Sequence, residues 1–119
     1  MAPLAHLTPL DPRYPSRLRG IDDAPASITV SGGSTEAAQT VAIVGSREPT
    51  GGARRFARDL ASTLAAAGVV VVSGGAIGID EAAHRGALRA NGRTWAIAGT
   101  GHERCFPVQR QALSMVLKK

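Results

Sequence analysis

VVVVSGGAIGID, at residues 69–80, sets the order of elements in this chain: four valines lead directly into a glycine-rich turn. A short, continuous apolar run is typical of a β-strand that is covered on both faces, as in a parallel sheet. The glycines permit a tight turn, and a helical pattern continues from Ile79 to Ala90. These residues therefore predict a strand, a loop and a helix in succession.

The same succession precedes this stretch. VAIV at residues 41–44 is a second short apolar run, and a loop with glycines follows it. Residues 53–67 have helical spacing, in which Phe56, Leu60 and Leu64 predict the apolar stripe that faces the core. Gly68 stands where a helix C-cap is expected.

The succession also continues after it, with a strand predicted at Thr94–Ala98, a loop that begins at Gly99 and a last helix at Pro107–Leu117. Strands and helices that alternate in this way imply parallel strands joined by right-handed crossovers. The predicted fold is therefore α/β, a Rossmann-like three-layer sandwich with a mostly parallel sheet. Trp95, within the third strand, is expected to be part of the core.

Residues 1–39 are predicted to form an N-terminal arm, and residues 40–119 the Rossmann-like domain. Five of the prolines lie between Met1 and Gly33, a density that disfavours regular helix. A short strand at Ile28–Val30 is the regular element expected there.

Composition limits the class of protein. The 119 residues suffice for one domain, and 14 Lys and Arg residues against 9 Asp and Glu residues give a net charge of +5, which suits an anionic partner. The single cysteine, Cys105, excludes an internal disulfide, and the histidines lack ligand spacing, so neither a metal nor a cofactor is expected. No signal peptide or membrane-spanning run is recognisable, which predicts a cytoplasmic protein without a membrane partner.

The three predicted strands all end in glycine, at Gly45, at Gly74 with Gly75, and at Gly99. Ligands bind at the carboxyl ends of parallel strands. Helix N-termini there offer free backbone amides and a positive partial charge. The sequence therefore predicts an anion-binding edge.

Several side chains near these loops have two interpretations each. Ser46 and Arg47 can hold a phosphate, or Ser46 can cap a turn while Arg47 pairs with Glu48 or solvent. Asp80 and His84, one helical turn apart, can act as acid and base, but without a nucleophile or metal cluster they are favoured as a structural pair at the helix start. Arg104 can reach the same anion or remain solvated.

The loops also carry a family resemblance. VAIVGSREPT at 41–50 and VVSGGAIGID at 71–80 resemble segments of the DprA/Smf DNA-processing proteins. AGTG at 98–101, Phe106–Pro107 and DPRYP at 11–15 are similar to further segments of that family. The similarity extends from about residue 10 to about residue 113.

This resemblance implies a protein that binds single-stranded DNA, dimerises, protects incoming DNA and helps to load the RecA recombinase in natural transformation. No catalysis is attributed to the family's core. Carried over by motif, the phosphate would be held by Gly45, Ser46 and Arg47, and the same pocket would be lined by Ser73, Gly74, Gly75 and Gly78. Arg104 matches only a loosely defined basic region.

The family's Rossmann domain is longer than this chain, which is therefore expected to be a fragment or a naturally short relative. Half a sheet leaves an exposed parallel edge, which predicts a homodimer. Two alternative functions remain. One is a nucleotide-binding protein or nucleotide hydrolase, which GTGHE at 99–103 superficially suggests; the other is a non-catalytic dimerising fragment.

Overall fold

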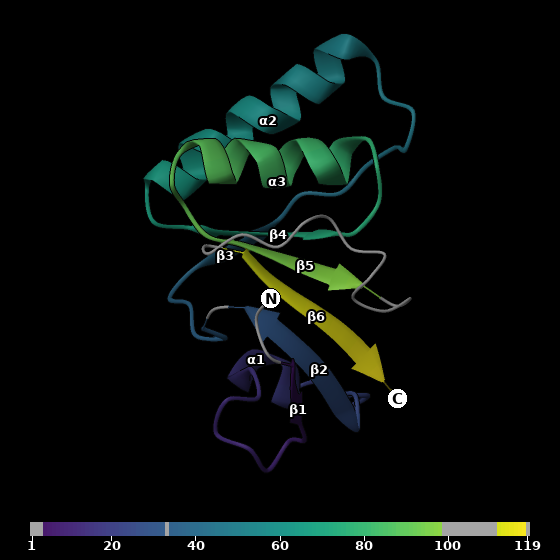
Figure 1. The fold of residues 1–119 in the computed structure, drawn as a ribbon, viewed down its shortest axis with the longest axis vertical. Helices are drawn as coiled ribbons and strands as arrows, with labels where there is room; N and C mark the ends of the chain where they lie inside the picture. The colour runs from purple at the N-terminus through teal and green to yellow at the C-terminus, as the bar shows by residue number, and fades with distance from the viewer. Residues whose placement is uncertain (1–3, 33, 99–111, 119) are drawn as a thin grey trace.

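The computed structural model describes residues 4–32, 34–98 and 112–118, which form one six-stranded sheet and its covering segments (Figure 1). The strand order is β1-β2-β6-β5-β4-β3. In chain order the elements are β1 (Leu4–Leu7), α1 (Ser16–Arg19), β2 (Ser27–Gly32), β3 (Thr40–Ala42), α2 (Gly51–Ala66), β4 (Val70–Gly74), α3 (Ile79–Arg89), β5 (Thr94–Ala98) and β6 (Ala112–Lys118).

Strands β3, β4 and β5 are parallel, and α2 and α3 are the crossovers that connect them. Val41 pairs with Val71, and Val72 pairs with Trp95, so the three apolar runs lie side by side. The prediction of a Rossmann-like α/β fold with a mostly parallel sheet is confirmed.

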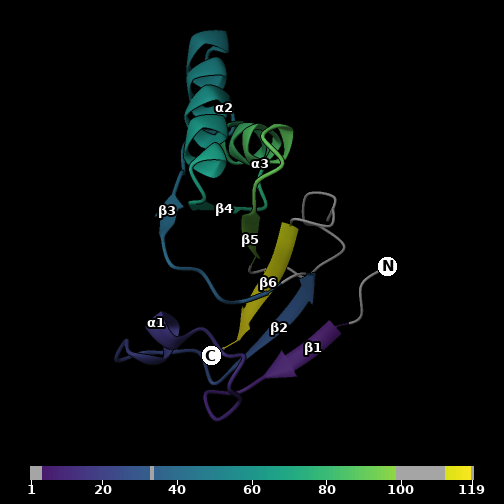
Figure 2. The same ribbon diagram turned by 90° about the vertical axis from the view of Figure 1, so that its left-hand side faces the viewer.

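Helices α2 and α3 pack on one face of the sheet through small residues (Figure 2). Ala57, Ala61 and Ala65 of α2 are buried. Gly86 of α3 lies against the backbone of Arg58, so close that a Cβ atom there would overlap it. The two helices therefore approach to backbone contact, which only glycine and alanine allow.

Two of the three residues that were predicted to form the buried stripe of α2, Phe56 and Leu60, lie at the surface. Phe56 is 70% exposed and Leu60 is 37% exposed, whereas Leu64 is half-buried. The helix is turned by one residue from the expected orientation, because its alanine face fits against Gly86 and the larger side chains do not. The large apolar residues therefore remain at the surface.

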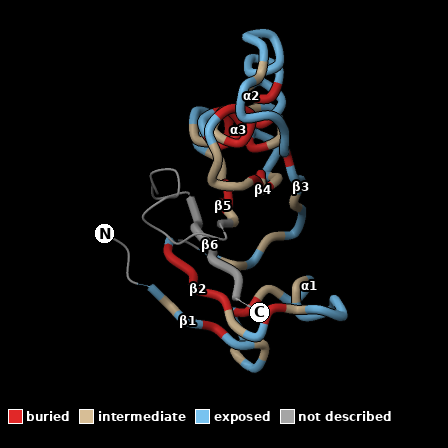
Figure 3. The backbone as a smooth tube through the Cα atoms, turned by 90° about the vertical axis from the view of Figure 1, so that its right-hand side faces the viewer, coloured by how far each residue is buried: buried red, intermediate tan, exposed pale blue. Residues whose placement is uncertain are grey.

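The other face of the sheet is covered by the N-terminal segment. Leu7, Tyr14 and Ile28 form a second core with Val70 and Trp95, and the burial of β2 is visible in Figure 3. The strand expected at Ile28–Val30 is confirmed within β2. The segment also contains β1 and the single turn α1, which local sequence did not predict because both depend on contacts with distant residues.

The predicted last helix is wrong where the structure describes it. Residues 112–118 form β6, which is parallel to β5 on one side and antiparallel to β2 on the other. Backbone pairing along two strand edges outweighs the helical spacing of this segment. Residues 107–111 of the predicted helix lie outside the described residues.

Replacement of Gly86 by Ala is expected to lower the free energy of unfolding by about 2 kcal/mol, because the added methyl group overpacks the contact between α2 and α3. Gly51→Ala is the matched control, since nothing lies within 4 Å of its Cβ position. Urea denaturation of both variants checks this. Equal free energies of unfolding for the two variants would contradict the prediction that a methyl group at position 86 overpacks the contact between α2 and α3.

Candidate functional site

The first two glycine-bearing loops meet at the carboxyl ends of β3 and β4. Gly78 has φ +91°, and a Cβ atom on it would overlap the carbonyl oxygen of Ser46 and lie 2.8 Å from the Cα of Arg47. The Ile79 amide donates a hydrogen bond to the same Ser46 carbonyl at 3.1 Å. These loops, residues 43–50 and 74–79, therefore share one rim. The third loop, with Gly99 and Arg104, lies outside the described residues.

The first loop presents its residues to solvent, since Gly45, Ser46 and Arg47 are all exposed. The Ser46 hydroxyl accepts a hydrogen bond from the Glu48 amide at 2.9 Å, so it caps a turn. This bond uses a lone pair and leaves the hydroxyl proton for donation. The Arg47 guanidinium forms no hydrogen bond or ion pair with any residue that the structure describes, Glu48 included.

Helix α2 begins at this rim, and its own first turn offers no carboxylate to compensate its positive end. Thr50 is the N-cap, and its hydroxyl oxygen accepts a hydrogen bond from the Ala53 amide at 3.1 Å. The first turn contains no acidic residue, and the exposed Arg54 and Arg55 follow immediately. Cations near a helix N-terminus are unfavourable, whereas an anion there is stabilised. The start of α2 is therefore suited to bind a negative group.

Helix α3 differs, because its first turn carries two carboxylates. Asp80 is 9% exposed and Glu81 is half-buried. These side chains already compensate the positive end of α3. Of the two helix starts at the rim, that of α2 is thus the better position for a phosphate.

Ser73 and Gly78, at the start and near the end of the second loop, are buried beneath the rim. Ser73 is 3% exposed, and its hydroxyl donates to the Ile43 carbonyl at 2.5 Å, which ties β4 to β3. Gly78 is buried as well, while Gly74 and Gly75 are partly exposed. A direct contact of Ser73 with a ligand would require this bond to break; its predicted role as a ligand-lining residue remains a prediction.

Asp80 and His84 lie on the inner side of α3. His84 is 1% exposed, with Nε2 2.8 Å from the Gly74 carbonyl oxygen and Nδ1 2.6 Å from the Thr94 hydroxyl. Burial lowers the pKa of the His84 imidazole, while the Gly74 hydrogen bond and the charge of Asp80 act in the opposite direction. The ring therefore connects α3 to both β4 and β5. The structural role of the pair with Asp80 remains a prediction, since the N-cap of α3 is Gly78 and has no side-chain hydrogen bond.

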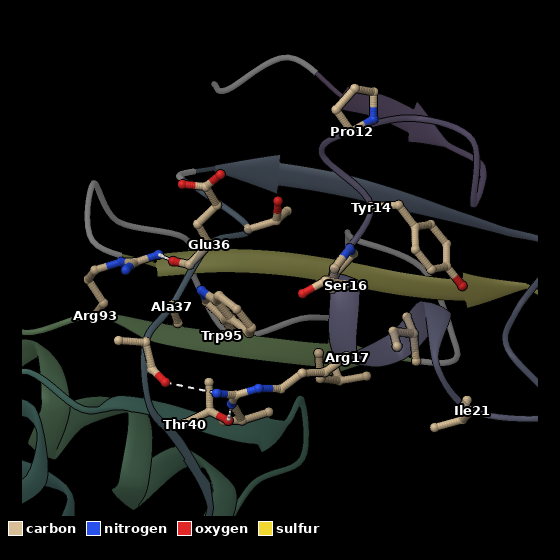
Figure 4. Close-up of a pocket in the computed structure, with 16 residues that line it drawn as sticks. Pro12, Tyr14, Ser16, Arg17, Ile21, Glu36, Ala37, Thr40, Arg93 and Trp95 are labelled. Carbon is tan, nitrogen blue, oxygen red and sulfur yellow. Dashed lines mark hydrogen bonds between the residues drawn. The ribbon is translucent and has the colours of Figure 1, made fainter.

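A separate hollow of about 870 Å³ lies on the sheet face opposite α2 and α3 (Figure 4). Trp95, 8% exposed, belongs to its floor and to the second core, as predicted. The two arginines at this hollow are engaged, since Arg17 donates to the Ala38 carbonyl at 2.8 Å and Arg93 donates to the Glu36 carbonyl at 2.7 Å. These bonds hold the chain segment before β3 in place, and sequence spacing gave no sign of them.

Two absences among the described residues, 4–32, 34–98 and 112–118, bear on the site. No group of three or more His, Cys, Asp or Glu side chains there is placed to hold a metal ion. In the same ranges, none of the helices has the length and apolar character needed to cross a membrane.

The stability of the protein is expected to fall as the pH falls below 6.5, the ordinary pKa of histidine. Because the pKa of His84 is lowered in the folded chain, the unfolded chain binds the proton first and is favoured in this range. Urea unfolding at a series of pH values checks this. His84→Gln should reduce the pH dependence below 6.5, and His6→Gln, at an exposed histidine, should retain it. Identical pH dependence in both variants would contradict the assignment.

The sequence of this chain is similar to those of one family of known proteins. A family model described as DNA recombination-mediator protein A matches residues 5–119. Protein Smf from Synechocystis sp. is 40% identical over 112 residues, which cover 90% of this chain and 28% of that protein. The chain thus spans less than a third of the length of this relative.

Two solved structures have similar folds. DNA processing protein A from Streptococcus pneumoniae superposes with a TM-score of 0.80 at 30% identity, over 95% of this chain and 43% of that one. A structure reporting the single-stranded DNA binding mode of DNA processing protein A from Helicobacter pylori gives a TM-score of 0.76 at 25% identity, over 98% of this chain and 56% of that one. Since the family model covers nearly all of its residues, this chain belongs to the DNA recombination-mediator protein A family, the DprA/Smf family that its loop motifs resemble.

Proposed function

We propose that this chain binds single-stranded DNA by its phosphate backbone at the rim where the first and second loops meet the start of α2. One observation carries the proposal. The exposed Ser46 and Arg47 lie in the loop that leads into a helix N-terminus with no carboxylate and with Arg54 and Arg55 close behind it. Among the residues that the structure describes, no carboxylate pairs with Arg47 and none lies in the first turn of α2, so this arrangement suits a negative ligand.

Each group at the rim would contact the phosphate backbone according to its chemistry. Backbone amides of the first loop and of the start of α2 would donate to phosphate oxygens. The Ser46 hydroxyl would add a further donor, and the Arg47 guanidinium would hold two oxygens of one phosphate. Gly75 would let the sugar-phosphate chain approach the backbone, while Ser73 and Gly78 would hold the loops together from beneath. Gly45 and Gly74 would serve the same packing, because Ile79 and Asp80 occupy the space where their Cβ atoms would lie.

Two further observations support DNA as the anion. The chain contains 12 arginines and has a net charge of +5. This favours binding of an extended polyanion over binding of a single small anion. The similar protein from Helicobacter pylori binds single-stranded DNA and shares this fold. Contacts of this type carry little sequence information, so we expect binding without marked sequence preference.

The burial of Asp80 and His84 favours binding over catalysis. Both nitrogens of His84 are engaged inside the protein, and Asp80 is nearly inaccessible. This acid–base pair is thus withdrawn from any substrate at the rim, which argues against a nucleotide hydrolase built on it. We therefore propose a non-catalytic role in the cytoplasm: protection of incoming single strands and help in loading a RecA-type recombinase during natural transformation and recombination. The family membership supports this role.

We also propose that the chain forms a homodimer through the free edge of β3. In the sheet that the structure describes, β3 is the terminal strand. Val41, Val44, Phe56 and Leu60 are exposed large apolar side chains on β3, the following loop and the adjoining α2. An exposed strand edge beside an apolar surface is a template for association.

Arg47→Ala is expected to weaken binding of short single-stranded oligonucleotides about tenfold, equally for all base sequences. The slope of log K against log salt should become shallower by about 0.7, because one phosphate contact is lost. Arg13→Ala is the control, since Arg13 is held by Asp11 at 3.0 Å, away from the rim. Fluorescence anisotropy across a salt series measures both, and a sequence-selective loss would contradict backbone binding.

The mass in solution at micromolar concentration is expected to be that of two copies. Phe56→Glu should give one copy, because it places a charge on the proposed interface. Leu10→Glu changes another exposed apolar residue, which is 95% exposed and lies elsewhere, and should leave the dimer intact. Analytical ultracentrifugation decides the point; a single-copy mass for the unchanged chain would exclude this interface.

A further inference from the structure

We propose that His84 is a positioning residue for the DNA-binding rim, which it serves by holding the Gly74 carbonyl and thereby the shape of the second loop. This inference rests on the proposed function, since it names what keeps that site in order. His84 is 1% exposed and so acts on a ligand only through the loop.

The hydrogen bond to Gly74 requires a proton on Nε2 of the His84 ring. A carbonyl oxygen can only accept, so the nitrogen 2.8 Å from Gly74, Nε2, must carry the proton of that bond. The other nitrogen, Nδ1, lies 2.6 Å from the Thr94 hydroxyl. That hydroxyl is also 2.9 Å from the Val71 carbonyl, so β5 and β4 together orient the ring.

The held carbonyl lies at the start of the second loop. Gly74 is the last residue of β4, and the loop ends where the Ile79 amide donates to the Ser46 carbonyl at 3.1 Å. Both ends of the loop are therefore tied, one to His84 and the other to the first loop. If the first tie is released, the contact of Gly78 with Ser46 and Arg47 loses its support from β4.

Asp80 reinforces this arrangement from the same helix. Its carboxylate lies over Gly74, where even an added Cβ atom would come within 2.6 Å of Oδ2. Within one turn of α3, Asp80 thus packs against Gly74 and His84 forms a hydrogen bond with the Gly74 carbonyl. No atom of either side chain needs to reach the DNA.

Two substitutions of His84 by an amide side chain distinguish the effect of losing the hydrogen bond to Gly74 from the effect of losing the imidazole ring. Glutamine can place an amide donor near the position of Nε2, so His84→Gln is expected to keep the bond to Gly74. Asparagine is shorter and places its amide near Nδ1, so His84→Asn keeps a partner for Thr94 and loses the tie to Gly74. The pair therefore serves as variant and matched control.

The first measurement uses the protein without DNA. In His84→Asn, the amides of residues 74–79 and 46–48 should exchange hydrogen at least tenfold faster than in the unchanged chain, while those of α2 remain as protected as before. In His84→Gln, exchange should match that of the unchanged chain. Equal exchange at the loops in all three proteins would overturn the proposal, whether or not DNA binds.

The second measurement is binding of a single-stranded oligonucleotide by the same three proteins. We expect His84→Asn to weaken binding about tenfold and His84→Gln to restore it, with both variants melting cooperatively. Undiminished binding by His84→Asn would overturn the positioning role and leave the proposed function standing. If the unchanged chain binds no oligonucleotide, the proposed function fails, and with it the role of His84 in DNA binding; faster exchange in His84→Asn would then show only that His84 orders the loops.

Discussion

The contact of Gly78 with the backbone of Ser46 and Arg47 is the constraint on which the rim depends. It brings two loops from different strands to one place and starts α3 immediately beside them. The hydrogen bond from Ile79 to Ser46 fixes that distance. Any other residue at position 78 would need both a positive φ and room that the first loop does not leave.

The parallel β3-β4-β5 core was predictable because each strand is a short apolar run followed by a glycine-bearing loop, a pattern that depends on local sequence alone. The meeting of the first two loops at one edge followed from the same pattern. The orientation of α2 was not predictable in this way. Hydrophobicity favoured Phe56 as the inward residue, whereas the fit of Gly86 against Arg58 selected the alanines. The buried face of α2 is determined by the fit of its surface against α3, which the sequence of α2 alone does not show.

The remaining differences also arise from distant partners. β6 is a strand because β2 and β5 both offer it an edge, and neither edge can be read from residues 112–118 themselves. At the candidate site, the binding roles of Ser46 and Arg47 were predicted from their loop and stay predictions. The engagement of Ser73 with Ile43 and of His84 with Gly74 could not be predicted, because each joins residues that only the folded sheet brings together.

The central position of β6 has a consequence for how the chain acquires its structure. Ser27 pairs with Lys118, so the N-terminal strands β1 and β2 are attached to the rest of the sheet by a segment from near the other end of the chain. During synthesis, β2 must wait for this strand while the parallel core can already assemble. Pairings between residues so far apart in sequence carry a large loop-closure entropy and form late. The order of assembly would then run from the parallel core outward, with the antiparallel pair of β1 and β2 joining last.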